Sequence, residues 1–166
     1  MHKVLLGIGG NVGDVSNAIE TAKITLCQCI DQLRISHLYE TEPHFDKPGS
    51  TVASVPNYIN AALSGLTHLS PSQLLISIQN IENALGRTRS IPCAPRTLDI
   101  DVLLYDDAII DTPELIVPHP RMHLRNFVLV PACDIESDWI HPIFGKTLAQ
   151  LLASCPDALA LKPYRR

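Results

Sequence analysis

Apolar residues recur along this chain at two different spacings, and each spacing predicts a different kind of element. A short apolar run over residues 3–9 is typical of a buried strand. Over residues 15–33 the apolar positions recur every three or four residues, which predicts a helix that Asp14 or Ser16 would cap. The apolar positions of this predicted helix are Ala18, Ile19, Ala22, Leu26, Ile30 and Leu33.

Residues 70–86 carry the clearest helix signal. Ser70 and Gln73 stand at the spacing of a capping box, and Pro71 suits the first turn. Gly86 is a typical residue for the C-terminal end. The predicted buried stripe consists of Leu74, Leu75, Ile78, Ile81 and Leu85.

Three further segments, residues 34–41, 58–66 and 95–107, predict strands. The order strand, helix, strand, strand, helix, strand matches the split βαβ plan. We therefore expect an α+β protein, a ferredoxin-like α/β sandwich whose mainly antiparallel sheet has helices on one face. We expect residues 108–111 to extend the sheet and residues 147–154 to form a C-terminal helix. The segments 43–56 and 86–95 predict long loops of the kind that cover binding sites and move.

Length and composition bound the possible functions. A chain of 166 residues, 46% hydrophobic and 18% charged, predicts one globular domain over residues 1–166. The net charge of −4 gives no basic field for nucleic acid. The first residues do not read as a signal peptide, and no stretch has the length of a membrane helix. Five scattered cysteines indicate a reducing compartment, so we expect a cytoplasmic protein with no disulfide framework.

The stretch PRTLDIDVLLYDD contains two carboxylates that interrupt an otherwise hydrophobic strand. Asp99 and Asp101 are two residues apart, so they should point to the same face of the sheet. The opposite face should consist of Leu98, Ile100, Val102 and Leu104. Two neighbouring anions repel each other unless a positive charge lies close to both of them. On general grounds a solvent-facing pair of acids is about as frequent as a functional pair.

The basic residues around this strand favour a functional pair. Arg87, Arg89 and Arg96 precede it, and the motif PHPRMHLR adds His119, Arg121, His123 and Arg125 after it. Mg²⁺ typically takes one or two carboxylates together with phosphate oxygens. Arginines grip the remaining phosphate oxygens. The cluster therefore predicts a substrate that carries both a metal ion and phosphates.

Tyr58 and Asn60 fall on one face of a predicted strand, and a ring beside an amide can hold a flat heterocycle. Such a pair is more often plain core packing. The motif GIGGNVGD fits neither the dinucleotide-binding nor the P-loop pattern, so a tight turn between strand and helix is the simpler interpretation.

Taken together, the motifs LGIGGNVGD, YETEP, NYINAAL, LGRTR, PRTLDIDVLLYDD and VPHPRMHLRNFVLVP resemble those of the 6-hydroxymethyl-7,8-dihydropterin pyrophosphokinase family, in the same order. The resemblance spans residues 4–131. It implies a ferredoxin-like fold and transfer of the pyrophosphoryl group of ATP to the pterin, with release of AMP, in folate biosynthesis. The resemblance also leans towards a monomer. Some members of the family are fused to neighbouring pathway enzymes, and we expect no such fusion in a chain of this length.

The resemblance also implies a role for each matching position. Asp99 and Asp101 match the acids that bind two Mg²⁺ ions. Arg87 and Arg96 match arginines that assist the transfer. The expected nucleotide contacts are Gln79, Glu82, Arg89, His119 and Arg125. The expected pterin contacts are Thr41, Tyr58, Asn60 and Phe127, with Tyr58 and Phe127 stacking on the two ring faces.

Three departures from the family pattern bear on loop closure: a long 43–56 segment, no tryptophan within 87–96, and Gly10 where serine is usual. Two other functions remain open at this stage. A ferredoxin-like regulatory module would bind a ligand without forming AMP. A different phosphotransferase would release ADP from another flat substrate.

Overall fold

The computed structural model describes residues 1–43, 56–86 and 97–165. Its main sheet has the strand order β5-β1-β4-β3-β8, with β2 also paired to β4, and every pairing is antiparallel. The strands are β1 His2–Gly10, β2 Ile30–Ile35, β3 Tyr39–Thr41, β4 Tyr58–Thr67, β5 Asp99–Tyr105 and β8 Leu161–Pro163. The predicted antiparallel α/β sandwich is therefore confirmed.

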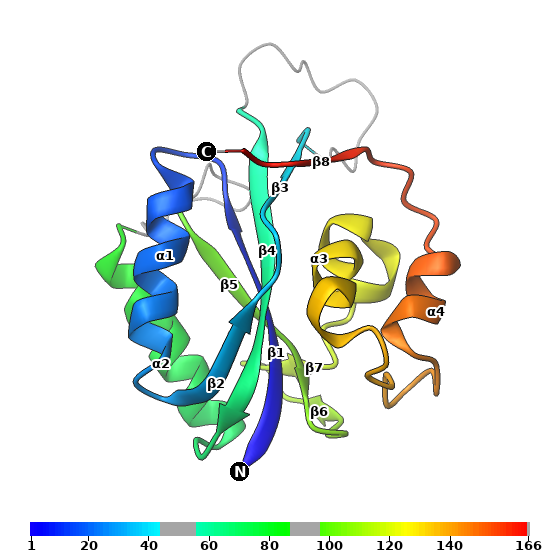
Figure 1. Ribbon diagram of the computed structural model, residues 1–166. Helices are drawn as coiled ribbons and strands as arrows, with labels where there is room; N and C mark the ends of the chain where they lie inside the picture. The colour runs from blue at the N-terminus through cyan, green and yellow to red at the C-terminus, as the bar shows by residue number, and fades with distance from the viewer. Residues whose placement is uncertain (44–55, 87–96, 166) are drawn as a thin grey trace.

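Helices cover both faces of this sheet, whereas the sequence predicts helices on one face only (Figure 1). Helices α1 (Val15–Leu26) and α2 (Pro71–Ala84) pack on one face around Leu6, Ile19 and Leu63. Helices α3 (Asn126–Glu136) and α4 (Leu148–Ala153) pack on the other around Leu5, Leu104 and Leu129. The hydrophobic pattern does not predict α3, because Pro131 interrupts it and a proline disfavours a helix interior.

The predicted helix over residues 15–33 is too long at its C-terminal end. Asp14 caps the helix by accepting a hydrogen bond from the Asn17 amide, and the helix ends at Leu26. Strand β2 follows and contains a bulge at Gln32, where φ is 51°. The extra residue places Ile30 and Leu33 on the same core-facing side. A bulged strand thus reproduces the three-residue spacing of a helix.

Ser36 explains why the predicted strand over residues 34–41 is divided into β2 and β3. The Ser36 amide donates to the Ala62 carbonyl oxygen at 2.9 Å. The Ser36 hydroxyl accepts from the Ala62 amide at 2.9 Å, in place of a backbone carbonyl. The side chain thereby replaces one step of the ladder, and β2 and β3 pair with different halves of β4.

A second bulge changes the face on which Leu104 lies. Leu98, Ile100 and Val102 are buried on the α1–α2 face, as the alternation predicts. The pairing of β1 with β5 shifts between Leu5 and Leu6, so that Leu103 is an extra residue. Leu104 therefore packs beside Leu103 on the α3 face, and its predicted placement is wrong.

Two smaller elements complete the fold. Strand β6 (Ile110–Asp111) pairs with β7 (Ile116–Val117) in a separate two-stranded sheet, so residues 108–111 do not extend the main sheet as predicted. The 3-10 helix η1 (Met122–Leu124) leads into α3. In the part of the chain that the structure describes, no helix is long and apolar enough to cross a membrane.

The helix predicted over residues 70–86 is confirmed, including its capping box of Ser70 and Gln73. Its buried stripe also contains an acid that the apolar pattern does not predict. Glu82 is 1% exposed, and its Oε1 accepts a hydrogen bond from the Ile100 amide at 2.8 Å. This contact ties α2 to the first residues of β5.

We expect Glu82→Ala to destabilise the fold by about 1–3 kcal/mol, since the buried Ile100 amide would lose its acceptor. Urea denaturation would measure the change. Asn80→Ala, an exposed substitution on the same helix, serves as the control and should change the free energy of unfolding by no more than about 0.5 kcal/mol. Equal midpoints for the two variants would contradict the anchoring role.

Candidate active site

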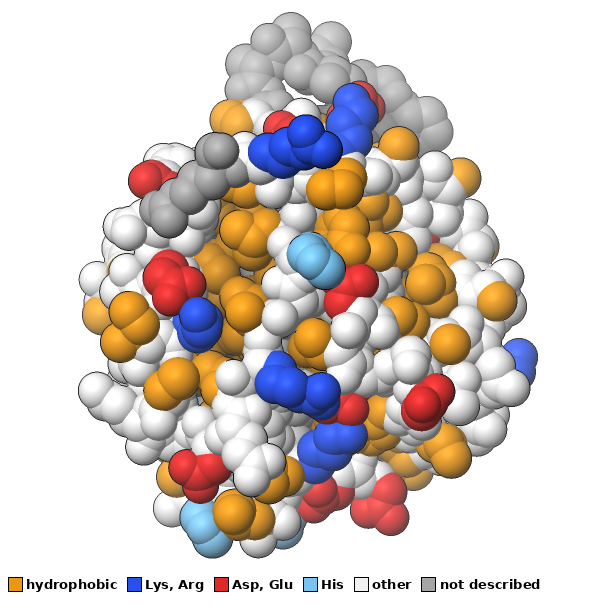
Figure 2. Space-filling model, viewed as in Figure 1, with side chains coloured by type: hydrophobic (Ala, Val, Ile, Leu, Met, Phe, Trp, Pro, Cys, Tyr) orange, Lys and Arg blue, Asp and Glu red, His pale blue; other side chains and the backbone are white. Residues whose placement is uncertain are grey.

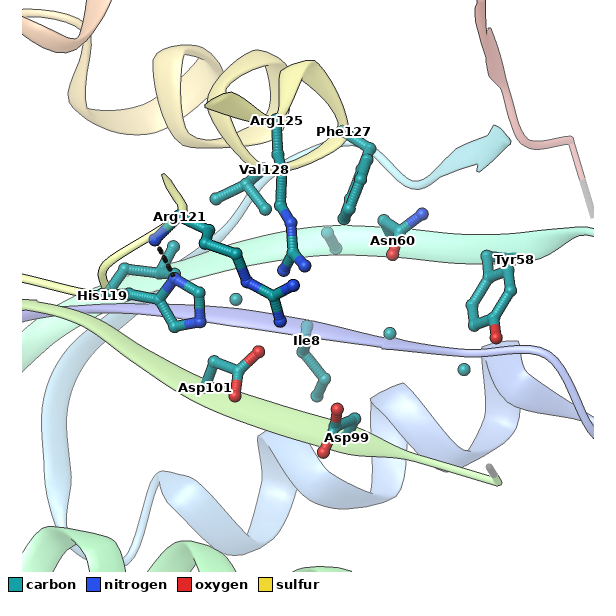
Figure 3. Close-up of a pocket in the computed structure, with 15 residues that line it drawn as sticks. Ile8, Tyr58, Asn60, Asp99, Asp101, His119, Arg121, Arg125, Phe127 and Val128 are labelled. Atoms are coloured by element: carbon teal, nitrogen blue, oxygen red, sulfur yellow. Dashed lines mark hydrogen bonds between the residues drawn. The ribbon is translucent and has the colours of Figure 1, made fainter. Parts of the chain in front are cut away.

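A cavity of about 360 Å³ lies on the α3 face of the main sheet. Its volume falls in the usual range for small-molecule sites. Residues from β1, β4, β5 and the start of α3 line it (Figure 3). The lining residues are Gly7, Ile8, Gly9, Gly10, Tyr58, Asn60, Ala61, Asp99, Asp101, Leu103, His119, Arg121, Arg125, Phe127 and Val128.

Asp99 and Asp101 stand on the same face of β5, as the two-residue spacing predicts (Figure 3). Asp99 is partly buried and Asp101 is exposed. Gly9 of β1 lies opposite Asp99, and Gly7 lies opposite Asp101. Neither glycine has a side chain that would fill the space beside the carboxylates. The two acids therefore face the cavity from its edge.

Basic side chains converge on the same cavity from the segment between β7 and α3. Arg121 and Arg125 direct their guanidinium groups toward the sheet, above the two carboxylates (Figure 3). The Arg125 guanidinium also lies 5.5 Å from the centre of the Phe127 ring, a cation–π contact. The cavity thus has carboxylates on the side formed by the sheet and guanidinium groups on the side formed by the segment before α3.

His119 lies beside these charges and is uncharged near neutral pH. Burial, together with the positive charges of Arg125 and Arg121, lowers the pKa of His119 to about 4. Its Nδ1 accepts a hydrogen bond from the Arg121 amide at 3.2 Å. The neutral ring therefore carries its proton on Nε2 and can donate one hydrogen bond.

The other end of the cavity suits a flat ring. Tyr58 and Asn60 project from the same face of β4, and Phe127 lies above that strand (Figure 3). Asn60 Nδ2 donates to Thr41 Oγ1 at 3.0 Å. Thr41 is 3% exposed, so it acts on the cavity through Asn60. This bond leaves Asn60 Oδ1 on the side of Gly9.

A second cavity of about 280 Å³ adjoins the first and shares Asp101 and His119 with it. Its remaining lining comes from α2, β5 and the β6–β7 hairpin and is mostly apolar. These residues are Leu75, Ile100, Val102, Pro113, Glu114, Leu115, Ile116 and Pro120. The adjacent cavities could accommodate a ligand with a charged middle and two less polar ends.

The structure brings together most of the residues that the sequence singles out. Asp99, Asp101, His119 and Arg125 line the first cavity. So do the three proposed ring contacts Tyr58, Asn60 and Phe127. Gln79 and Glu82 lie on α2 and are not among the residues that line either cavity. Arg87, Arg89 and Arg96 lie outside the described residues.

Several lining residues were not singled out by the sequence as site residues. Arg121 belongs to the basic motif PHPRMHLR, in which every second residue from His119 to Arg125 is basic. This spacing is a signal that could identify Arg121 as a site residue. The sequence contains no comparable signal for the apolar wall of the second cavity, because Leu115 and Ile116 are apolar residues of a common type. Their role depends on how the hairpin folds against β5.

The acid pair fits Mg²⁺ better than a metal held by protein groups alone. Across residues 1–43, 56–86 and 97–165, no group of three or more histidine, cysteine, aspartate or glutamate side chains could hold a metal ion. Mg²⁺ needs only one or two carboxylates when a substrate supplies phosphate oxygens. Two carboxylates opposite guanidinium groups match that ligand set.

The fold and these two cavities define a small α+β protein whose sheet presents a pair of carboxylates beside a pocket lined by Tyr58, Asn60 and Phe127. The sequence profile described as 7,8-dihydro-6-hydroxymethylpterin-pyrophosphokinase matches residues 5–137. This match covers most of the chain, so the chain belongs to the 7,8-dihydro-6-hydroxymethylpterin-pyrophosphokinase family.

Two bacterial relatives have similar lengths. The 2-amino-4-hydroxy-6-hydroxymethyldihydropteridine pyrophosphokinase of Synechocystis is 37% identical over 98% of this chain and 80% of its own. The enzyme of the same name from Aquifex aeolicus is 38% identical over 90% of both chains. The crystal structure of HPPK-DHPS from Plasmodium falciparum matches 92% of this chain and 45% of its own, with a TM-score of 0.73. At 16% identity, this last similarity shows the fold alone.

We expect Gly9→Ala to weaken ring binding, since a Cβ at this position would lie 2.6 Å from Asn60 Oδ1 and 2.8 Å from the Ile59 carbonyl oxygen. Asn60 would have to move. Gly7→Ala is the matched control, because the three atoms nearest its Cβ all belong to the flexible Leu103 side chain, at 3.4–3.6 Å. Fluorescence titration with a pterin should give about tenfold weaker binding for Gly9→Ala only. Equal affinities for the two variants would contradict the positioning of Asn60 by Gly9.

We expect His119 to remain neutral down to about pH 4 in the metal-free protein, with its pKa below the ordinary value of 6.5. The unfolded chain binds this proton between pH 6.5 and 4, whereas the folded chain does not. His119 therefore lowers stability as pH falls through that window and has no such effect above it. An NMR titration of the His119 ring would measure the pKa. A His119 midpoint near 6.5 would contradict the expectation.

Proposed function

We propose that this chain transfers the pyrophosphoryl group of ATP to the hydroxymethyl group of 6-hydroxymethyl-7,8-dihydropterin, giving AMP and the pterin diphosphate for folate biosynthesis. One observation carries this proposal: the same cavity is lined by the carboxylates of Asp99 and Asp101 and by Tyr58, Asn60 and Phe127. Membership of the pyrophosphokinase family supports the same reaction. We further propose that the enzyme works as a single-domain monomer in the cytoplasm.

We propose that Asp99 and Asp101 hold two Mg²⁺ ions. Phosphate oxygens of the nucleotide would supply further ligands to both ions. When bound, Mg²⁺ would neutralise phosphate charge and orient the reacting groups. Partial exposure of both carboxylates leaves them accessible to metal delivered with the nucleotide.

Arg125 and Arg121 would bind the phosphate chain from the wall opposite the acids, where their charge also favours the transition state. His119 would donate from Nε2 to a phosphate oxygen. By the family resemblance, Arg87 and Arg96 would assist transfer and Arg89 would contact the nucleotide. These three arginines lie outside the described residues.

The second cavity would hold the adenine ring against its apolar wall. Leu75 lines this cavity, and Gln79 lies four residues later on the same face of α2. We propose that Gln79 contacts the nucleotide from this face of the helix. Glu82 would act through its hydrogen bond to the Ile100 amide, because Ile100 also lines the cavity.

Tyr58 and Phe127 would stack on the two faces of the pterin, with Asn60 Oδ1 accepting a hydrogen bond from its polar edge. Thr41 would fix the Asn60 amide in this orientation. We propose that no described side chain acts as a general base. His119 already carries its proton on Nε2, the nitrogen that can face the phosphates, and its low pKa makes it a poor base.

We expect Asp101→Ala to lower turnover about a thousandfold, because metal binding contributes several kcal/mol of transition-state stabilisation. The fold should persist, since Asp101 is exposed. Asp107→Ala, in the exposed turn after β5, is the control and should retain full activity. Chromatography of the nucleotide products would follow AMP in the presence of Mg²⁺, ATP and the reduced hydroxymethylpterin.

The same assay separates this function from the two other candidates. AMP that forms only when the pterin is present supports pyrophosphoryl transfer. Formation of ADP would indicate a different phosphotransferase. Nucleotide binding with neither product would indicate a regulatory module. Near-normal AMP formation by Asp101→Ala would contradict the metal assignment.

A further inference from the structure

The C-terminal segment returns from α4 to the far side of the cavity and ends as β8 beside β3 (Figure 1). It lies beyond residues 5–137, the part of the chain that matches the family. β8 also lies at the surface: Lys162 and Arg165 are exposed, and Figure 2 shows basic side chains gathered at the top of the molecule. We call residues 157–164 the strap.

The strap is fastened to the first residue of α3 by three hydrogen bonds. The Asn126 amide donates to Asp157 Oδ2 at 3.1 Å. Asn126 Nδ2 donates to the carbonyl oxygens of Asp157 and Leu159, at 3.1 and 2.6 Å. Asp157 Oδ1 accepts from the Leu159 amide at 2.9 Å, which holds the carboxylate in this position.

Asp157 therefore supplies the cap that α3 lacks in its own sequence. Arg125 occupies the N-cap position and makes no side-chain cap hydrogen bond. A carboxylate at this end satisfies a free amide and interacts favourably with the helix dipole. The capped turn contains Phe127 and follows Arg125, and both side chains line the cavity.

The other end of the strap holds β3. Leu161 pairs with Thr41 and Lys162 with Glu40, and the Tyr164 amide donates to the Leu38 carbonyl oxygen at 2.8 Å. Thr41 in turn accepts the hydrogen bond that orients Asn60. The strap thus connects the two sides of the ring-binding pocket, Phe127 on one side and the Thr41–Asn60 pair on the other.

We infer that the strap sets the spacing of the ring-binding pocket, with Asp157 as a positioning residue for the pterin. This inference rests on the function proposed above. Leu129 and Ala132 pack the body of α3 into the core, and Asp134 accepts a hydrogen bond from the Tyr39 hydroxyl at 2.9 Å. These contacts hold the later turns of α3. The first turn, which carries Phe127, depends more on Asp157.

Loss of the cap should let the first turn open without unfolding the helix. Removing a capping side chain typically changes such an equilibrium by about fivefold. A pocket that is formed for a smaller fraction of the time binds its ligand more weakly by that fraction. The pterin should be affected more than ATP, because Phe127 lies inside the capped turn. Of the groups proposed to hold the nucleotide, Arg125 adjoins this turn, whereas Asp99, Asp101 and Arg121 belong to other segments.

The experiment compares Asp157→Ala, Asp157→Asn and Lys162→Ala with the unsubstituted protein. Lys162→Ala is the matched control, because its side chain is exposed while its backbone keeps the pairing with Glu40. Three quantities are measured: amide hydrogen exchange at residues 126–128 and 39–41, the Kd for the pterin by fluorescence, and KM for ATP with kcat.

We expect Asp157→Ala to speed exchange at residues 126–128 about fivefold. The pterin Kd should rise by up to about fivefold, a limit set by the fraction of the protein in which the first turn is open. The KM for ATP and kcat should stay within about twofold. Asp157→Asn, which keeps an oxygen acceptor, should restore most of the affinity, and Lys162→Ala should match the unsubstituted protein.

Three results would overturn the inference. Faster exchange with an unchanged pterin Kd would make the strap purely structural. Equal weakening of pterin and ATP would indicate general loosening of the fold. Unchanged exchange would mean that Asp157 does not hold the first turn. Failure of the proposed function would be distinct, because the unsubstituted protein itself would then form no AMP from ATP and the pterin.

Discussion

The site depends on the position of β1 between β4 and β5. Gly9 pairs with Asn60 on one side and with Asp99 on the other, and Gly7 pairs with Ala62 and Asp101. This double register places the Asn60 amide and the carboxylates on either side of a stretch of β1 in which Gly7 and Gly9 leave that face without side chains. A shift of one residue in either pairing would turn one set of groups into the α1–α2 core.

The charges of the site follow from this arrangement. Carboxylates from a central sheet face arginines that arrive from the irregular segment before α3, and the cavity between them suits a substrate that carries both cations and anions. His119 is buried beside the arginines, and burial, followed by their positive charge, lowers its pKa so that the ring is neutral. A neutral donor beside two guanidinium groups adds a hydrogen bond without adding further positive charge to be desolvated.

The sequence predicts the central features of the fold and site because they depend on local spacing. The capping box of α2 and the shared face of Asp99 and Asp101 are both local.

The errors in the predicted structure arise where pairing with a distant strand changes the local spacing of apolar residues. The bulge at Gln32 places Ile30 and Leu33 together with a helix-like spacing, and the extra residue Leu103 moves Leu104 to the other face. Helix α3 contains Pro131 and is stabilised by tertiary packing, which no local pattern reports. The second cavity forms only when a distant hairpin folds against β5.

The location of the acid pair also affects how the protein behaves in concentrated solution. β5 is the terminal strand on its side of the sheet, and such an edge can accept a strand from a second molecule. Two of its backbone groups already have partners, because the Ile100 amide donates to Glu82 and the Leu103 carbonyl oxygen accepts from the His119 amide. Asp99 and Asp101 place two negative charges on this strand, so two such edges brought together would repel each other. The side chains that prepare the sheet for a substrate thereby also discourage edge-to-edge aggregation.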